Sequence, residues 1–137
     1  MESVVTHRTT APPDEVYRVL ADGWSYPAWV VGASRMREVD AAWPDPGARL
    51  HHSVGAWPLL IDDTTEVLAG EPGHRLRLLA HARPLGHAEI EITLEPDGGG
   101  CLMTMREKPV GVPGRLAAPV ATPALGPRNR ESLRRLT

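Results

Sequence analysis

Apolar and polar residues alternate along most of the chain between residues 34 and 107. The alternation is clearest where Ile90, Ile92 and Leu94 are interleaved with polar residues. A period of two predicts β-strands that bury one face and expose the other. Clusters of glycine and proline divide this region into six expected strands: Ser34–Asp40, Ala48–Val54, Pro58–Leu68, Arg75–Ala82, His87–Glu95 and Cys101–Glu107. With an earlier strand at Ser3–Thr9, the short connections predict an antiparallel meander.

A helix is predicted in the segment that follows the first strand. Proline suits a first helical turn, and after Pro13 the residues Val16, Val19 and Leu20 form one apolar stripe. The helix should end near Gly23, and the segment Trp24–Val30 is expected to be a loop or a second short helix.

The end of the chain differs in composition from the rest. Five prolines punctuate the Ala-rich stretch after Lys108, so a continuous helix through that stretch is not expected. From Pro127 onward a helix is expected, with Asn129, Leu133 and Leu136 on one stripe. The two leucines should pack on the sheet, and Asn129 should face the rim of a cavity between the sheet and this helix.

Length and composition limit the function classes. The 137 residues suit one domain, covering residues 1–137. Fifteen basic against seventeen acidic residues give a net charge of −2, which argues against a nucleic-acid partner. No apolar run approaches the roughly 20 residues of a membrane span. A single cysteine, Cys101, and the absence of a signal-peptide pattern make a reducing cytoplasm the expected location. A homodimer is compatible with the sequence.

Three stretches carry a family resemblance that extends over nearly the whole chain. They are the opening Ala11–Asp22 with the aromatic segment Trp24–Trp29, the strand segment Asp63–Val67, and Cys101–Glu107 after a glycine hairpin. With the order of elements, they resemble the SRPBCC superfamily, which includes START-type lipid-transfer proteins and polyketide cyclase/dehydrase-like proteins. The resemblance implies an α+β helix-grip fold: a curved antiparallel sheet of about seven strands, two short helices, and a C-terminal helix over an apolar cavity.

The sequence lacks common motifs for phosphate binding, nucleophilic catalysis and metal binding. It has no phosphate-binding loop and no nucleophile elbow, and Gly98–Gly100 belongs to a hairpin. His51 and His52 are adjacent in a strand and therefore point to opposite faces, which disfavours chelation of one ion. We expect neither a cofactor nor a metal.

The alternation assigns three polar side chains to the apolar face of the sheet. His52 shares parity with Leu50, Asp63 with Val67, and Glu107 with the two methionines of the last strand. Buried ionisable groups are costly unless paired, so these three are the candidates for acid–base catalysis. A structural histidine and an exposed strand end are the alternative interpretations of His52 and Glu107. Candidate ligand-binding residues are Trp24, Trp29, Trp57, Met103, Met105, Asn129 and Leu133.

Three functions follow from these features. The first hypothesis is binding of a small, largely hydrophobic molecule between the sheet and the C-terminal helix. The second is a polyketide cyclase/dehydratase-like enzyme in which His52, with Asp63 or Glu107, transfers protons. The third is a protein-interaction module whose cavity is filled by its own side chains.

Overall fold

A computed structural model describes residues 2–30, 33–54, 61–81, 87–110 and 127–136. The elements are β1 (Ser3–Thr9), α1 (Pro13–Ala21), a 3-10 helix (Gly23–Ser25), α2 (Tyr26–Trp29), β2 (Ala33–Val39), β3 (Arg49–Val54), β4 (Ile61–Glu71), β5 (Arg75–His81), β6 (His87–Asp97) and β7 (Gly100–Val110). A last helix, here called the C-terminal helix, spans residues 127–136. The order of elements is the one that the alternation and the helical stripes predict.

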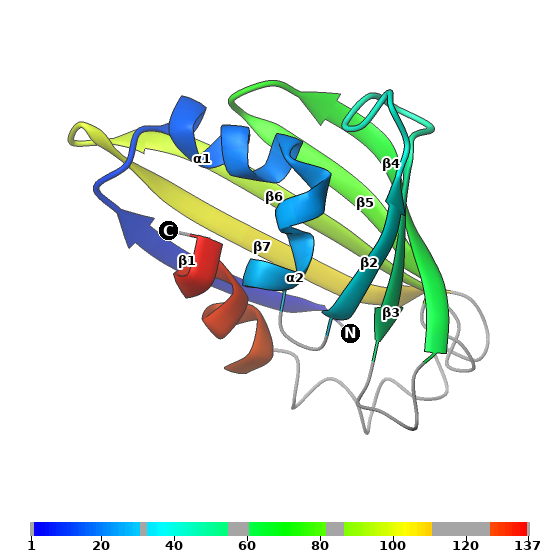
Figure 1. Ribbon diagram of the computed structural model, residues 1–137. Helices are drawn as coiled ribbons and strands as arrows, with labels where there is room; N and C mark the ends of the chain where they lie inside the picture. The colour runs from blue at the N-terminus through cyan, green and yellow to red at the C-terminus, as the bar shows by residue number, and fades with distance from the viewer. Residues whose placement is uncertain (1, 31–32, 55–60, 82–86, 111–126, 137) are drawn as a thin grey trace.

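The seven strands form one antiparallel sheet in the order β1-β7-β6-β5-β4-β3-β2. The meander therefore runs from β2 to β7, and β1 joins it beside β7, with Ser3 opposite Glu107 and Thr9 opposite Cys101. The sheet is curved, and the helices lie on its concave side (Figure 1). The predicted α+β architecture is confirmed, and the concave face is the side that the helices cover.

Two glycines determine where the β6–β7 hairpin turns. Gly98 and Gly99 form the two-residue turn and have positive φ angles of 57° and 88°. A type I′ hairpin turn requires positive φ at both of these positions, which glycine adopts readily. The tight turn lets β6 run to Asp97 and β7 begin at Gly100. The glycine- and proline-containing cluster at residues 69–73 predicted that the strand ends at Leu68. In the structure β4 continues to Glu71 and stays paired with β5 through a bulge after Val67.

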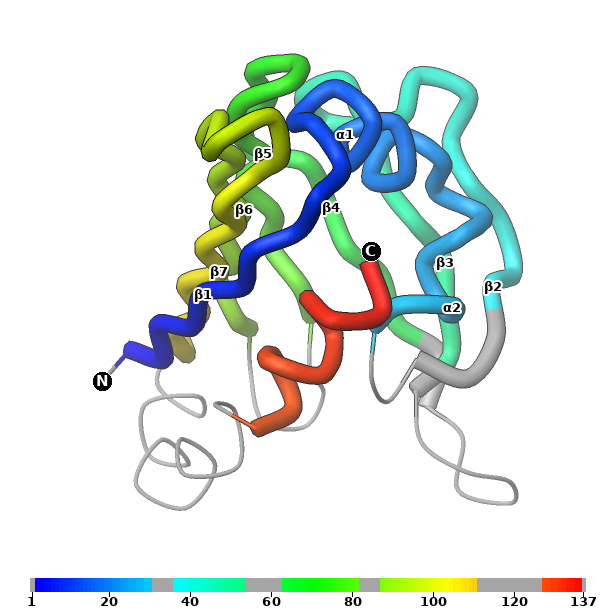
Figure 2. The backbone as a smooth tube through the Cα atoms, turned by 90° about the vertical axis from the view of Figure 1, so that its left-hand side faces the viewer, coloured from blue at the N-terminus to red at the C-terminus, as the bar shows by residue number. Residues whose placement is uncertain are grey.

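The helices cover the concave face in two places. Helix α1 buries Val16, Tyr17 and Leu20. Val16 and Leu20 belong to the apolar stripe that the sequence predicts. The C-terminal helix buries Leu133 and Leu136, which are 0% and 4% exposed, as predicted. Figure 2 shows this helix lying between the β1 and β2 ends of the curved sheet, below α1. The region between the sheet, α2 and the C-terminal helix is called the interior below.

The convex face of the sheet is charged. Arg77 pairs with Glu89 across β5 and β6 at 2.8 Å, and Arg75 pairs with Glu91 at 3.5 Å. Lys108 on β7 also approaches Glu89, at 3.7 Å. These side chains are partly exposed, so the predicted solvent-facing ladder of arginine and glutamate is confirmed.

Candidate functional site

The first group of buried polar side chains surrounds His52 on β3. His52 is 3% exposed and lies directly opposite Asp63 of β4. Thr65, two residues further along β4, is fully buried on the same face. The prediction from parity that His52 and Asp63 point toward the interior agrees with their burial.

One ring nitrogen of His52 is held and the other is not. Nε2 lies 2.9 Å from Thr65 Oγ1, and the Tyr26 hydroxyl lies 3.4 Å from the same oxygen. The His52 ring stacks on Tyr26, with centroids 5.3 Å apart, and Tyr26 makes an edge contact with Trp29 at 5.4 Å. The buried Nδ1 of His52 has no hydrogen-bond partner in the described part of the chain. We call His52, Thr65 and Tyr26 the histidine cluster.

Burial determines the ionisation of the histidine cluster. Loss of hydration lowers the pKa of His52 below 6.5, although the negative charge of Asp63 acts in the opposite direction. Burial also raises the pKa of the Tyr26 hydroxyl above 10.0. At neutral pH the cluster therefore consists of a neutral imidazole, a hydroxyl and a neutral phenol.

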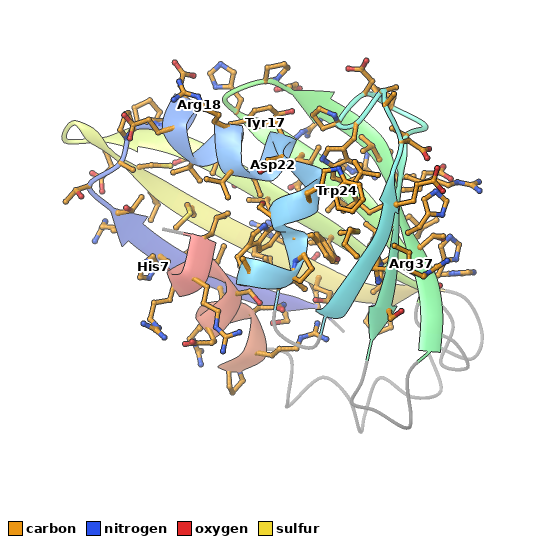
Figure 3. The ribbon with its side chains drawn as sticks, in the orientation of Figure 1. His7, Tyr17, Arg18, Asp22, Trp24 and Arg37 are labelled. Carbon is orange, nitrogen blue, oxygen red and sulfur yellow. The ribbon has the colours of Figure 1, made fainter. Side chains whose placement is uncertain are left out.

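Asp63 is held by the backbone around it. Its Oδ1 accepts a hydrogen bond from the Thr64 N–H at 2.9 Å. Arg37 extends from β2 (Figure 3) and donates to the main-chain carbonyl of Asp63 at 3.1 Å and to that of His52 at 3.5 Å. The guanidinium thus ties β2 to β3 and β4 beside the histidine cluster.

The second group of buried polar side chains surrounds Glu107 on β7. Its Oε1 accepts hydrogen bonds from Arg128 Nη2 at 2.6 Å and from Asn129 Nδ2 at 3.1 Å. Both donors belong to the first turn of the C-terminal helix, and Glu107 and Asn129 are 6% and 3% exposed. We call Glu107, Arg128 and Asn129 the glutamate clamp, because these contacts join the helix to the sheet.

The structure does not join the three candidate catalytic residues into one hydrogen-bonded set. Nε2 of His52 contacts Thr65, Nδ1 has no partner in the described residues, and Glu107 Oε1 is held by the C-terminal helix. The groups are nevertheless close enough to interact: the charges of Glu107 and Arg128 both act on Tyr26. Tyr26 is therefore the member of the histidine cluster on which the charges of the glutamate clamp act.

The expected ligand-binding residues divide into four sets. Trp29, Met103, Met105 and Leu133 are at most 5% exposed and belong to the buried core. Trp24 does not line the interior, because it is 59% exposed on the surface (Figure 3). Its neighbour Gly23 takes the inward position, where an added Cβ would meet Leu50 at 2.6 Å. Trp57 lies outside the described residues, and Asn129 belongs to the clamp.

Three side chains of the candidate site were not predicted from the sequence. Thr65 could have been found, because it shares parity with Asp63 in an alternating strand. Arg128 directly precedes Asn129, but its contact with Glu107 depends on how the C-terminal helix lies on the sheet. Tyr26 comes from the four-residue helix α2, which has no periodicity that could assign a direction to its side chains.

The described residues form neither a metal-binding group nor a membrane-spanning helix. In the described ranges, no group of three or more histidine, cysteine or acidic side chains is arranged to hold a metal ion. None of the helices in these ranges combines the length and the apolar composition needed to cross a bilayer.

The curved sheet around a C-terminal helix defines the helix-grip class, and the comparisons with known proteins agree. A family model described as polyketide cyclase / dehydrase and lipid transport matches residues 1–137. The chain belongs to this family, which confirms the resemblance to the SRPBCC superfamily. A search of curated proteins gives no significant match.

Solved structures show the same fold at low sequence identity. A protein from Rhodobacter sphaeroides is 23% identical, with a TM-score of 0.75 over 98% of this chain and 88% of that one. Protein CV1439 from Chromobacterium violaceum is 21% identical, with a TM-score of 0.71 over 99% and 94%. Ara h 8.0201 is 12% identical, with a TM-score of 0.67 over 99% and 97%. These likenesses establish the fold alone, and the family and fold are consistent with binding of a hydrophobic molecule.

Proposed function

We propose that this protein binds a small, largely hydrophobic molecule in its interior, between the curved sheet and the C-terminal helix. The observation that carries the proposal is the combination of an apolar wall with one unsatisfied polar atom. Trp29, Met103, Met105 and Leu133 supply the wall, and His52 Nδ1 supplies the polar atom. Ligand sites typically combine mostly apolar walls with a few placed polar groups.

The two other hypotheses have less support. Acid–base catalysis needs a base within hydrogen-bond reach of the reacting group, and Glu107 is already bonded to Arg128 and Asn129. An interior packed solid with its own side chains would leave His52 Nδ1 without a partner, which is costly. Binding is the function that uses both features.

The two tryptophans near α2 offer a matched test. Trp29 is buried beside Tyr26, whereas Trp24, in the preceding 3-10 helix, is exposed. With the neutral dye N-phenyl-1-naphthylamine as the probe, Trp29→Ala should weaken binding clearly, because it removes apolar contact area worth roughly 25 cal/mol per Å². Trp24→Ala should leave binding unchanged. Circular dichroism checks that both variants fold, and Trp29→Phe should retain most of the affinity.

Native mass spectrometry of the protein purified from its host provides an independent measurement. We expect a co-purifying small apolar molecule in the wild type. Failure of the wild-type protein to bind the dye, together with a mass equal to the bare chain, would contradict the proposal. Equal weakening by Trp24→Ala and Trp29→Ala would place the binding site elsewhere.

A further inference from the structure

The unpartnered Nδ1 of His52 indicates which chemical class of ligand the interior can bind. The side chain is 3% exposed, and Nδ1 itself is buried with no hydrogen-bond partner in the described part of the chain. Buried polar atoms are nearly always paired, so an unpaired one needs an explanation. The explanation depends on whether Nδ1 carries a proton.

The hydroxyl groups of the histidine cluster decide the tautomer. Thr65 Oγ1 is shared by His52 Nε2 at 2.9 Å and the Tyr26 hydroxyl at 3.4 Å. If Tyr26 donates to Thr65 and Thr65 donates to Nε2, both hydroxyl protons are used, and only the Nδ1–H remains unpaired. If Nε2 carries the proton and donates to Thr65, one hydroxyl proton in the cluster loses its acceptor and Nδ1 is an unpaired acceptor as well. The first arrangement has fewer unsatisfied groups, so it is the favoured one.

The imidazole in this arrangement is neutral. Burial lowers the pKa of His52, so the ring carries a single proton at neutral pH. With Nε2 accepting from Thr65, that proton is on Nδ1. The interior thus presents one neutral N–H donor among apolar and aromatic side chains.

We propose that His52 Nδ1–H donates a hydrogen bond to a carbonyl oxygen of the bound molecule, which makes the ligand class a neutral, largely apolar carbonyl compound. The inference rests on the proposed function, because it specifies the ligand of the same interior. His52 is then the residue that determines specificity, and Thr65 and Tyr26 are positioning residues that fix its tautomer.

The charges around the cluster favour a neutral carbonyl over a carboxylate. Asp63 acts electrostatically on His52, and Glu107 acts on Tyr26. Two arginines also act on these rings: Arg37, which donates to main-chain carbonyls, and Arg128, which is held at 2.6 Å by Glu107. A buried carboxylate would need a cation or several donors to replace its hydration, whereas a ketone or ester oxygen needs a single N–H.

Three probes of nearly the same shape can separate these ligand classes. 2-Acetylnaphthalene has a carbonyl, 2-isopropenylnaphthalene replaces the oxygen by a methylene group, and 2-naphthoate replaces the methyl ketone by a carboxylate. We expect the ketone to bind about 3- to 10-fold more tightly than the hydrocarbon, which is the usual net effect of one hydrogen bond. The carboxylate should bind more weakly than either.

Two substitutions of His52 test which nitrogen acts. His52→Gln places an amide near Nε2 and retains the contact with Thr65, but it has no donor at Nδ1. His52→Asn places an amide near Nδ1 and loses the contact with Thr65. The preference for ketone over hydrocarbon should disappear in His52→Gln and return in part in His52→Asn. Binding of the hydrocarbon shows in each variant that the interior is intact.

Infrared spectroscopy gives a readout that a merely structural role would not change. The stretching frequency of an isotope-labelled carbonyl in bound 2-acetylnaphthalene should be lower than in cyclohexane, and this lowering should be lost in His52→Gln. If His52→Gln binds neither neutral probe, the wild-type affinity ratio and the infrared frequency decide the question.

The outcomes distinguish failure of the inference from failure of the proposed function. Equal wild-type affinities for ketone and hydrocarbon, with an unshifted carbonyl band, would overturn the inference and leave hydrophobic binding standing. Tighter binding of 2-naphthoate than of the ketone would overturn the choice of a neutral ligand. Absence of binding by all three probes would overturn both proposals.

Discussion

The histidine cluster and the glutamate clamp are both buried and polar, but the protein completes only one of them. Glu107 receives two donors from the C-terminal helix, at 2.6 and 3.1 Å. His52 has its Nε2 bonded to Thr65 and its Nδ1 unpaired in the described residues. A completed group connects two parts of the chain, whereas an incomplete one is available to a ligand. The difference indicates a structural role for Glu107 and supports the proposed binding role of His52.

The largest effect is expected where the completed group is broken. Glu107→Gln keeps the shape of the side chain but removes the charge that holds Arg128 and Asn129. We expect the free energy of unfolding in urea to fall by about 1–3 kcal/mol, the typical cost of disrupting a buried, charge-assisted hydrogen bond. Hydrogen exchange should also become faster in residues 127–136, because the helix loses its attachment to β7.

An exposed glutamate on the same helix provides the control for this variant. Glu131 accepts hydrogen bonds from Arg134 and Arg135 at the surface. Glu131→Gln should change stability much less than Glu107→Gln, because solvent screens these pairs. Similar losses in both variants would mean that the clamp contributes no more than a surface ion pair.

The next prediction concerns the pH dependence of the histidine cluster. Burial lowers the pKa of His52 below 6.5 in the folded state, and the unfolded chain retains the ordinary value. As the pH falls below 6.5, the unfolded state therefore takes up the proton first, and the free energy of unfolding decreases. His81, whose pKa is also lowered by burial, contributes in the same direction. Above 6.5 the contribution of both histidines to stability is fully present.

Urea titrations between about pH 7.5 and pH 5 would measure this slope. His52→Gln should reduce the loss of stability toward acid, and the part that remains should include the contribution of His81. His74→Gln is the matched control, since His74 is an exposed histidine between β4 and β5. An unchanged slope in His52→Gln would show that His52 is not kept neutral by burial.

How far the sequence predicts the site depends on the range of the interactions. The inward direction of His52, Asp63 and Glu107 follows from a period of two, which is a local property of each strand. Their partners are not local. Thr65 meets His52 through the register of β3 and β4, and Arg128 meets Glu107 only when the C-terminal helix folds back on the sheet.

The two neighbouring tryptophans show the same limit. Trp24 and Trp29 are five positions apart in a segment without clear periodicity, and composition makes both of them wall candidates. In the structure one is 59% exposed and the other 5%. The difference arises because Gly23 packs tightly against Leu50 and Val39, leaving the surface side for Trp24. Only the packing of the short helices on β2 and β3 decides between them.

The smallest effect is expected on the convex face, which shows what a charge pair contributes when water is present. Arg77 and Glu89 are 2.8 Å apart, and their side chains are 37% and 27% exposed. Arg77→Ala should lower the free energy of unfolding by only about 0.2–1 kcal/mol, since exposed pairs gain little over hydration. A double-mutant cycle with Glu89→Gln isolates the coupling between the two side chains. The coupling should be weaker than the loss in Glu107→Gln, because Arg128 and Asn129 meet a carboxylate that is 6% exposed. A loss of several kcal/mol in Arg77→Ala would mean that the convex face carries the stability assigned here to the concave one.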